Sequence, residues 1–238
     1  MTPKNIFCLG MIRSGSTWQF NVAREIVEAA WPEEERPLVH KAHNIIGSVR
    51  DVLDDPENLI MYIHRDIRDA LASYWEHYGT GDEQSLKHRA SLAIVHHREV
   101  MRLTETDAER LFYMEYTEMV ESPLFWVEAT AEFLCVPYPD TTSGLFLEVL
   151  PHLPQIADRW SIPEVQKRMA ERGAHPNEVL GLVEPNRRDF FAQSADPVTK
   201  VTGHHISRLE GEIGRYKRVK EGTMARVIID WAWEEINA

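Results

Sequence analysis

The sequence predicts a three-layer α/β protein in which a mainly parallel sheet is flanked by helices. Short apolar runs of strand length alternate with longer amphipathic segments of helical length, an order typical of parallel sheets. The first apolar run leads directly into a glycine- and hydroxyl-rich turn and then into a helical segment. With 238 residues, of which 43% are hydrophobic, the chain can bury one sizeable core, and we expect a single domain over residues 1–238.

Four apolar runs are expected to form the strands of this sheet, with helical patterns between them. These runs are residues 5–9, 37–40, 58–64 and 110–114. The first helix is expected to begin at Thr17, directly after the glycine-containing turn, and to run to Trp31.

After Thr117 the pattern becomes mostly helical, and helices are expected over residues 117–134 and 161–172. A C-terminal helix is expected to carry one apolar face, made of Met224, Val227, Ile228 and Trp231. The stretch 174–201 is rich in Pro, Asn and Asp. It is expected to be a loop, either a lid over a site or a plain surface connection.

The net charge and the two cysteines argue against several classes of partner and site. The formal net charge of −12 argues against a general nucleic-acid or anionic-membrane surface, although a small basic pocket remains compatible with it. No run reaches the roughly 18 apolar residues of a membrane helix, and the N-terminal residues lack the layout of a signal peptide. We therefore expect a soluble, cytoplasmic protein. Cys8 and Cys135 lie in apolar segments and are expected to be reduced core thiols rather than a disulfide or a metal site.

The turn after the first strand has the outline of a phosphate-binding loop. Glycines stand at 10 and 15 and a hydroxyl at Thr17, but Ser16 occupies the position of the lysine that reaches the β- and γ-phosphates of a nucleoside triphosphate. Without that lysine the loop keeps the amides and the helix N-terminus that hold a phosphate, but it should be poor at triphosphate chemistry. The alternative is an ordinary strand-to-helix turn with a serine cap.

A second candidate phosphate site follows the third strand. Arg65 ends that strand, and Ser73 lies eight residues later on the next helix. Eight residues are close to two helical turns, so both side chains can reach one phosphate, with the planar fork of the arginine and the serine hydroxyl as donors. The alternative is an arginine that forms a surface ion pair with Asp69.

Lys41 and His43 stand where the second strand passes into a loop, the edge at which α/β proteins bind ligands. They point to the same side if the strand geometry persists. A histidine can take a proton near neutral pH, and a lysine beside it can stabilise charge on a transferring group.

Taken in this order, the motifs resemble those of the sulfotransferases that use 3′-phosphoadenosine 5′-phosphosulfate (PAPS). The resemblance covers residues 5–137 and, more weakly, 203–218. It implies the P-loop-like fold of that family, with the core motifs in 5–137 and a helical, loop-rich substrate and C-terminal part in 138–238.

The resemblance also implies roles for individual residues. The 5′-phosphosulfate loop corresponds to Arg13, Ser14, Gly15, Ser16, Thr17 and Trp18, of which Trp18 would stack on adenine and Arg13 would stabilise the leaving phosphate oxygen. Arg65 and Ser73 correspond to the pair that binds the 3′-phosphate, and Tyr116 to a tyrosine that helps to place the adenine. His43 corresponds to the general base, with Lys41 contacting the sulfuryl group.

The C-terminal signature departs from the family pattern. Gly211, Gly214, Tyr216 and Lys217 fit, but Leu209 and Glu210 replace a basic pair that belongs to the cofactor site. Either Arg208 or Arg215 would supply the missing charge. The sequence leaves open which of the two does so.

The resemblance implies sulfuryl transfer from PAPS to a hydroxyl or amine of a small-molecule or carbohydrate acceptor, without a metal. Two alternatives stay open. One is a P-loop nucleotide or small-molecule kinase, with Asp66 as magnesium ligand. The other is a module that binds PAPS or adenosine 3′,5′-bisphosphate (PAP) without turnover. Candidates for the acceptor wall are His77, Tyr78, His96, His97, Trp160, Phe190 and Phe191. Neither the acceptor nor the oligomeric state is indicated by the sequence.

Overall fold

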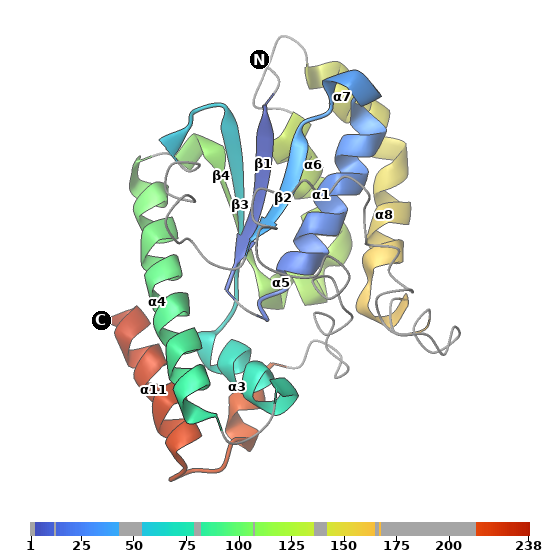
Figure 1. The fold of residues 1–238 in the computed structure, drawn as a ribbon. Helices are drawn as coiled ribbons and strands as arrows, with labels where there is room; N and C mark the ends of the chain where they lie inside the picture. The colour runs from blue at the N-terminus through green and yellow to red at the C-terminus, as the bar shows by residue number, and fades with distance from the viewer. Residues whose placement is uncertain are drawn as a thin grey trace.

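A four-stranded parallel sheet with strand order β2-β1-β3-β4 forms the centre of the molecule (Figure 1). The computed structural model describes residues 3–11, 13–42, 54–78, 82–106, 108–135, 142–164, 167 and 213–238. The strands are β1 (Asn5–Gly10), β2 (Leu38–Ala42), β3 (Asn58–His64) and β4 (Leu111–Glu115). The predicted strands are thus confirmed to within two residues, and so is the α/β class.

The middle strands β1 and β3 are apolar throughout because helices cover both faces of the sheet. Ile6 and Cys8 point into the core on the side of α1, whereas Phe7 and Leu9 point to the opposite side. All four side chains are buried. This double burial explains why the strands read as continuous apolar runs rather than as alternating patterns.

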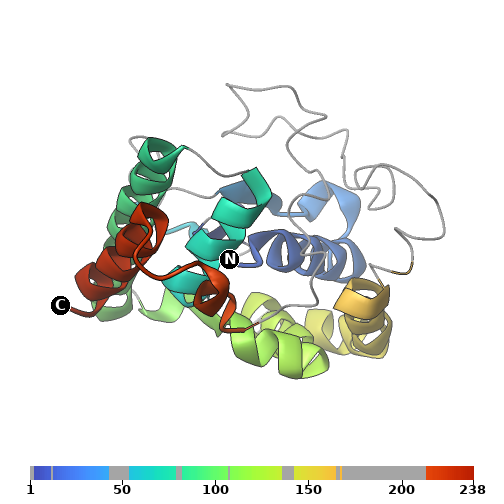
Figure 2. The same ribbon diagram turned by 90° about the horizontal axis from the view of Figure 1, so that it is seen from below.

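Helices pack on both faces and beyond one end of the sheet (Figures 1 and 2). One face carries α1 (Ser16–Ala30), α6 (Pro123–Cys135), α7 (Thr142–Val149) and α8 (Leu153–Trp160), and the other carries α4 (Glu83–Thr106). Beyond the carboxyl ends of the strands lie α3 (Ile67–Tyr78) and α11 (Met224–Asn237), which pack on each other and on α4. Short 3-10 helices are η1 (Glu33–Glu35), η2 (Ala108–Arg110), η3 (Leu150–His152) and η5 (Arg215–Arg218).

The helix predicted over 117–134 is two helices, α5 (Tyr116–Glu121) and α6. Ser122 leaves the helical conformation, with φ −135° and ψ 63°, because the residue before a proline is pushed out of the α region. Pro123 then starts α6, where its missing N–H costs nothing. Of the helix predicted over 161–172, residues 162–164 and 167 are helical. The rest of it, like the stretch 174–201, lies outside the described residues.

The predicted apolar face of the C-terminal helix was wrong for two of its four residues. Met224 and Val227 are 53% and 55% exposed. The buried residues of α11 are Ala225, Ile228, Ile229 and Ala232. The two alanines pack in one core cluster with residues of α3 and α4.

Both cysteines lie in the core beside α1, where they are free thiols. Burial raises the pKa of Cys135 to about 12 and that of Cys8 still further. This agrees with the expectation of inert core thiols. Within the described part of the chain, no helix is long and apolar enough to cross a lipid bilayer.

Two histidines of α4 face the sheet. The ring of the buried His96 lies 5.3 Å from the ring of Tyr62, and Nδ1 of His97 lies 3.3 Å from the Tyr62 hydroxyl. Burial lowers the pKa of His96 to about 3 and that of His97 to about 4. Both rings are therefore neutral in the folded protein at pH 5 to 8.

These neutral histidines should make the fold sensitive to acid. Between pH 6.5 and pH 4 the unfolded chain binds a proton at His96 that the folded chain refuses, so stability is complete above pH 6.5 and falls as the pH is lowered. At pH 5, about 1.5 units below the ordinary histidine pKa, His96 should lower the free energy of unfolding by about 2 kcal/mol relative to pH 8. For His96→Leu, the free energy of unfolding measured with urea should differ between pH 8 and pH 5 by about 2 kcal/mol less than in the unaltered protein. An unchanged difference would contradict the assignment, and His88→Leu, in an exposed part of α4, serves as control.

Candidate functional site

The β1–α1 turn presents the N-terminus of a 15-residue helix. Gly15 occupies the N-cap position at φ 97°, and no side chain caps the first turn. Arg13 is also left-handed, at φ 65°. A Cβ on Gly15 would lie 2.9 Å from the ring of Tyr116, so both the conformation and the space require glycine there. The N-terminal end of α1, where the helix dipole favours an anion, thus faces this turn.

The side chain of Ser14 strengthens this anion site. Ser14 is fully buried, and its hydroxyl has no hydrogen-bond partner among the described residues. A Cβ on Gly10 would collide with this hydroxyl, so the glycine makes room for it. A buried hydroxyl without a partner is costly unless a ligand completes its hydrogen bonds. Ser14 and the helix N-terminus therefore form a phosphate-sized donor set.

Lys41 brings positive charge to the same turn. It lies at the end of β2, in register with Cys8 of β1, and its Nζ donates to Thr17 Oγ1 at 2.7 Å. The ammonium group therefore stands at the first turn of α1. His43, the predicted general base, lies outside the described residues.

A second cluster of donors, which could hold an anion, surrounds the hydroxyl of Ser73 on α3. Arg13 Nε donates to Ser73 Oγ at 3.1 Å, and Arg215 Nη1 donates to the same oxygen at 2.9 Å. Arg65 Nη1 donates to the carbonyl oxygen of Arg13 at 2.8 Å. The residues Arg13, Arg215 and Arg65 are only 8%, 3% and 4% exposed, respectively. The structure thus brings together residues from three distant parts of the chain.

The hydrogen bonds of Ser73 select an anion. A hydroxyl has two acceptor positions and one proton, and two arginine donors take both acceptor positions of Ser73. What Ser73 can offer a ligand is its proton, so the ligand must be an acceptor. Burial lowers the pKa of Arg65, and the charge of Arg215 lowers it further, whereas Tyr116 and Asp69 raise it.

Other residues keep Arg65 in place. Its guanidinium lies over the ring of Tyr116, 4.3 Å from the centroid, and this ring also packs on Gly15. Tyr116 therefore stands between the two anion sites. A surface ion pair with Asp69 does not fit, because both residues are buried. Asp69 still acts on Arg65 electrostatically, and its carboxylate accepts hydrogen bonds from the amides of Gly214 and Tyr216.

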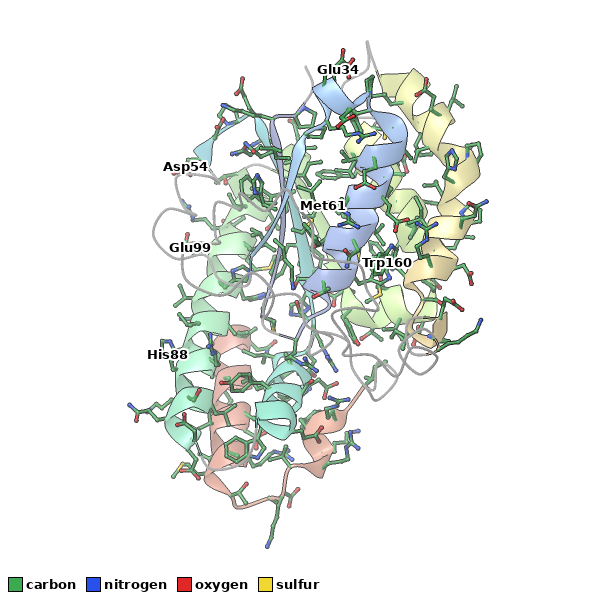
Figure 3. All side chains as sticks on the ribbon, turned by 45° about the vertical axis from the view of Figure 1, so that its right-hand side comes forward. Glu34, Asp54, Met61, His88, Glu99 and Trp160 are labelled. Atoms are coloured by element: carbon green, nitrogen blue, oxygen red, sulfur yellow. The ribbon has the colours of Figure 1, made fainter. Side chains whose placement is uncertain are left out.

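An apolar pocket of about 410 Å³ adjoins Trp18 on α1. It is lined by Trp18, Met119, Val120, Pro123, Trp160, Ser161, Ile162 and Pro163. Trp160, labelled in Figure 3, lies at the end of α8 and donates from Nε1 to Glu25 of α1 at 2.8 Å. A pocket of this character suits a planar, weakly polar group such as a nucleobase.

Asp66, the magnesium ligand of the kinase alternative, is engaged otherwise. Its Oδ2 lies 2.6 Å from Nη2 of Arg68, and its Oδ1 accepts from the Arg68 amide at 2.9 Å. Asp66 thus begins α3 as a capping residue. Among the described residues, no three His, Cys, Asp or Glu side chains come together as metal ligands would.

Sequence reasoning missed Asp69 as an anchor. It named Trp160 as a candidate for the acceptor wall but missed Ser161, Ile162 and Pro163, which line the pocket with it. Asp69 precedes Ser73 by four residues, a spacing that puts both on one helical face and that was available as a signal. The pocket wall has no such signal, because α8 reaches Trp18 only through tertiary packing. Arg208 and Gly211 lie outside the described residues, as do Phe190 and Phe191.

Comparisons with known proteins identify the family and the fold. The sequence profile of the family described as sulfotransferase domain matches residues 8–153. Retinol dehydratase in complex with androsterone and the inactive cofactor PAP has a TM-score of 0.59 at 12% identity, covering 99% of this chain and 81% of that chain. Mouse sulfotransferase SULT7A1 complexed with PAP gives 0.58 at 14% identity, covering 100% and 86%. At these identities the structures show a shared fold. No curated protein matches the chain in sequence.

The packing at Gly15 generates a stability prediction. Gly15→Ala should lower the free energy of unfolding by about 1–2 kcal/mol, because alanine is strained at a positive φ and its Cβ meets the Tyr116 ring. Gly144→Ala is the matched control, since Gly144 lies in α7 and an added methyl group there would meet nothing within 4 Å. That control should be neutral or stabilising by up to about 1 kcal/mol. Equal effects of the two changes in urea unfolding would contradict the role of Gly15.

Proposed function

Because the chain belongs to the sulfotransferase family, we propose that it transfers a sulfuryl group from PAPS to a hydroxyl or amine of a small-molecule or carbohydrate acceptor. The observation that carries this proposal is the Ser73 hydroxyl, which accepts from both Arg13 and Arg215 inside a buried, positive site. A second anion site lies at the helix N-terminus of the β1–α1 turn. PAPS has two separate anionic ends, and a kinase substrate with a single polyphosphate chain would leave the Ser73 site unexplained.

In this proposal the 5′-phosphosulfate binds at Ser14, Gly15, Ser16 and Thr17, and the 3′-phosphate binds at Arg65 and Ser73. The adenine occupies the pocket beside Trp18, with Tyr116 between the two phosphate positions. Arg13 serves both ends, because its backbone belongs to the turn while its guanidinium contacts Ser73. The neighbouring structures, which were solved with PAP, support this arrangement.

Sulfuryl transfer depends on position and charge more than on covalent help. The acceptor oxygen or nitrogen forms a bond to sulfur while the bond from sulfur to the phosphate oxygen breaks in line, and PAP leaves. His43 takes the proton of the acceptor. Lys41, next to Thr17 at the start of α1, stabilises the negative charge on the transferring group. Arg13 meets the leaving phosphate with its backbone, because its guanidinium contacts Ser73.

The proposal is tested first by binding. Isothermal titration calorimetry should show PAP binding more tightly than adenosine 5′-monophosphate. At about 100 times its dissociation constant, PAP should raise the free energy of unfolding by roughly 2.7 kcal/mol. Arg65→Ala should weaken PAP binding by about 10- to 100-fold, with little change for the monophosphate, because only PAP carries the 3′-phosphate. Arg102→Ala removes a half-exposed arginine of α4 and should change neither affinity. Equal affinity for both nucleotides in the unaltered protein would contradict the assignment.

The catalytic step is tested with labelled PAPS and a panel of phenols, alcohols, amines and sugars. His43→Ala should lower turnover about 10²- to 10⁴-fold, as expected for loss of a general base, with the affinity for PAP little changed. Turnover should also persist in the presence of a chelator. Unchanged turnover would remove His43 from the mechanism, and PAP binding without sulfation of any acceptor would favour a binding module.

A further inference from the structure

His64 and Glu115 end β3 and β4 side by side, and neither takes part in the proposed nucleotide sites. They are partners in the sheet register, and His64 Nδ1 lies 3.0 Å from Oε2 and 3.1 Å from Oε1 of Glu115. The Tyr113 hydroxyl donates to Oε1 at 2.8 Å. Tyr113 packs in the core cluster on the α4 side of the sheet. Because side chains alternate along a strand, His64 and Glu115 lie on that same side.

The Glu115 carboxyl is ionised. Burial acts to raise its pKa, but the hydrogen bonds from His64 and Tyr113 and the charge of His64 outweigh burial, so the pKa lies below its ordinary value. The phenol of Tyr113 shows the opposite effect, because burial and the hydrogen bond to Glu115 both raise its pKa. Tyr113 therefore keeps its proton and donates to a carboxylate.

The Glu115 carboxylate has acceptor positions that its neighbours leave open. Two carboxylate oxygens offer about four lone-pair positions. Tyr113 fills one of them, and the single Nδ1 proton of His64 is shared between both oxygens. Among the described residues no other donor contacts this carboxylate, and the side chain is 39% exposed. A ligand group that binds there must therefore donate a hydrogen bond.

Stacked rings hold the donors of Glu115 in place. The His64 ring stacks on the Tyr113 ring, with 5.9 Å between centroids and 23° between planes. On its other contact it lies 5.1 Å from the ring of His97 on α4. The imidazole is thus packed between a strand and a helix. The orientation of the carboxylate follows from these fixed partners.

The charges around Glu115 favour an uncharged donor. The carboxylate repels an anion. Two arginines oppose a cation: Arg65 directly follows His64, and Arg98 adds to the effect of burial in lowering the pKa of His97. A neutral hydroxyl group meets neither penalty, and its hydrogen bond to a carboxylate is of the strong, charge-assisted kind.

The pair lies at the edge of the sheet where the sulfuryl group would be transferred. His64 and Glu115 stand at the carboxyl ends of their strands, and the β1–α1 turn follows the neighbouring strand. The pocket beside Trp18 is lined by residues of α1, α5, α6 and α8, which lie away from α4 (Figure 1). An in-line displacement places the acceptor and the leaving nucleotide on opposite sides of the sulfur. The α4 side of this edge is therefore left for the acceptor.

On this basis we infer that Glu115 determines acceptor specificity by accepting a hydrogen bond from a hydroxyl group adjacent to the one that is sulfated. His64 and Tyr113 are its positioning residues. The inference rests on the proposed function and narrows its acceptor to an uncharged molecule with neighbouring hydroxyl groups, either an aromatic diol or a sugar-like diol.

The test is ligand-observed NMR titration of catechol, phenol and benzoate into the whole chain saturated with PAP. Catechol should bind about tenfold more tightly than phenol, as expected for one hydrogen bond to a charged group, and benzoate more weakly than phenol. Glu115→Gln should reduce the preference for catechol to less than about threefold and leave the affinity for PAP within about twofold. Glu118→Gln removes an exposed carboxylate of α5 and should change neither.

Tyr113→Phe tests the positioning role. It removes one of the donors that orient the carboxylate, so the preference for catechol over phenol should fall about threefold while PAP binds as before. A merely structural role would weaken both ligands alike. If Glu115→Gln fails to fold, as judged by circular dichroism, Tyr113→Phe carries the test.

A second matched pair, cis-1,2-cyclohexanediol and cyclohexanol, distinguishes the two kinds of diol. A Glu115-dependent preference for the diol in either pair supports the inference, and the pair with the larger preference identifies the kind. With labelled PAPS, the same preference should appear in kcat/KM.

The outcomes separate this inference from the proposed function. If the unaltered protein binds PAP but prefers neither diol, or binds benzoate best, the inference is overturned and the proposed function stands. A preference that persists unchanged in Glu115→Gln also overturns it. If the unaltered protein does not bind PAP, the proposed function fails and the inference fails with it.

Discussion

The buried hydroxyl of Ser73 is the point on which the site depends. A serine in the middle of a helix is usually a minor packing residue, but here its oxygen accepts from arginines that come from the β1–α1 turn and from the C-terminal segment. Burying several guanidinium groups together is unfavourable unless they share hydrogen-bond acceptors and nearby carboxylates. Ser73 and the carbonyl of Arg13 supply the acceptors. Asp69 and Glu76 supply nearby carboxylates, which act on Arg65 and Arg215, respectively.

The parallel sheet explains why such distant residues meet. All four strands run in the same direction, so the segments that follow β1, β2 and β3 emerge at one edge. The turn with Ser14, the Lys41 side chain and the arginine at the head of α3 therefore lie next to one another. The C-terminal segment is added from outside the sheet, through contacts with α3 and α11.

Much of the site followed from local patterns. The glycine-containing turn, Lys41, and the spacing from Arg65 to Ser73 each depend on short-range rules of strand ends and helix turns. The structure places Lys41 against Thr17 and Arg13 against Ser73. The strands could likewise be predicted from the sequence, because β1 and β3 are buried on both faces and therefore form continuous apolar runs.

Long-range packing set the features that could not be predicted from the sequence. The split between α5 and α6 at Pro123 was visible in principle, but the register of α11 depends on which side of it meets α3 and α4. The choice between Arg208 and Arg215 was undecided for the same reason, since the path of a chain onto a helix is not encoded in spacing. The contacts of Arg215 with Ser73 come from that tertiary arrangement.

At Arg13, the residue that would stabilise the fold best differs from the residue that the site uses. Its backbone has the left-handed conformation that glycine or asparagine adopts more easily, and a protein engineer seeking heat tolerance would choose this position early. The gain would sacrifice the guanidinium that joins the turn to Ser73. A variant made more heat-stable in that way would lose a positive charge at the Ser73 cluster. Screens for thermal stability in this protein should therefore leave Arg13 unchanged.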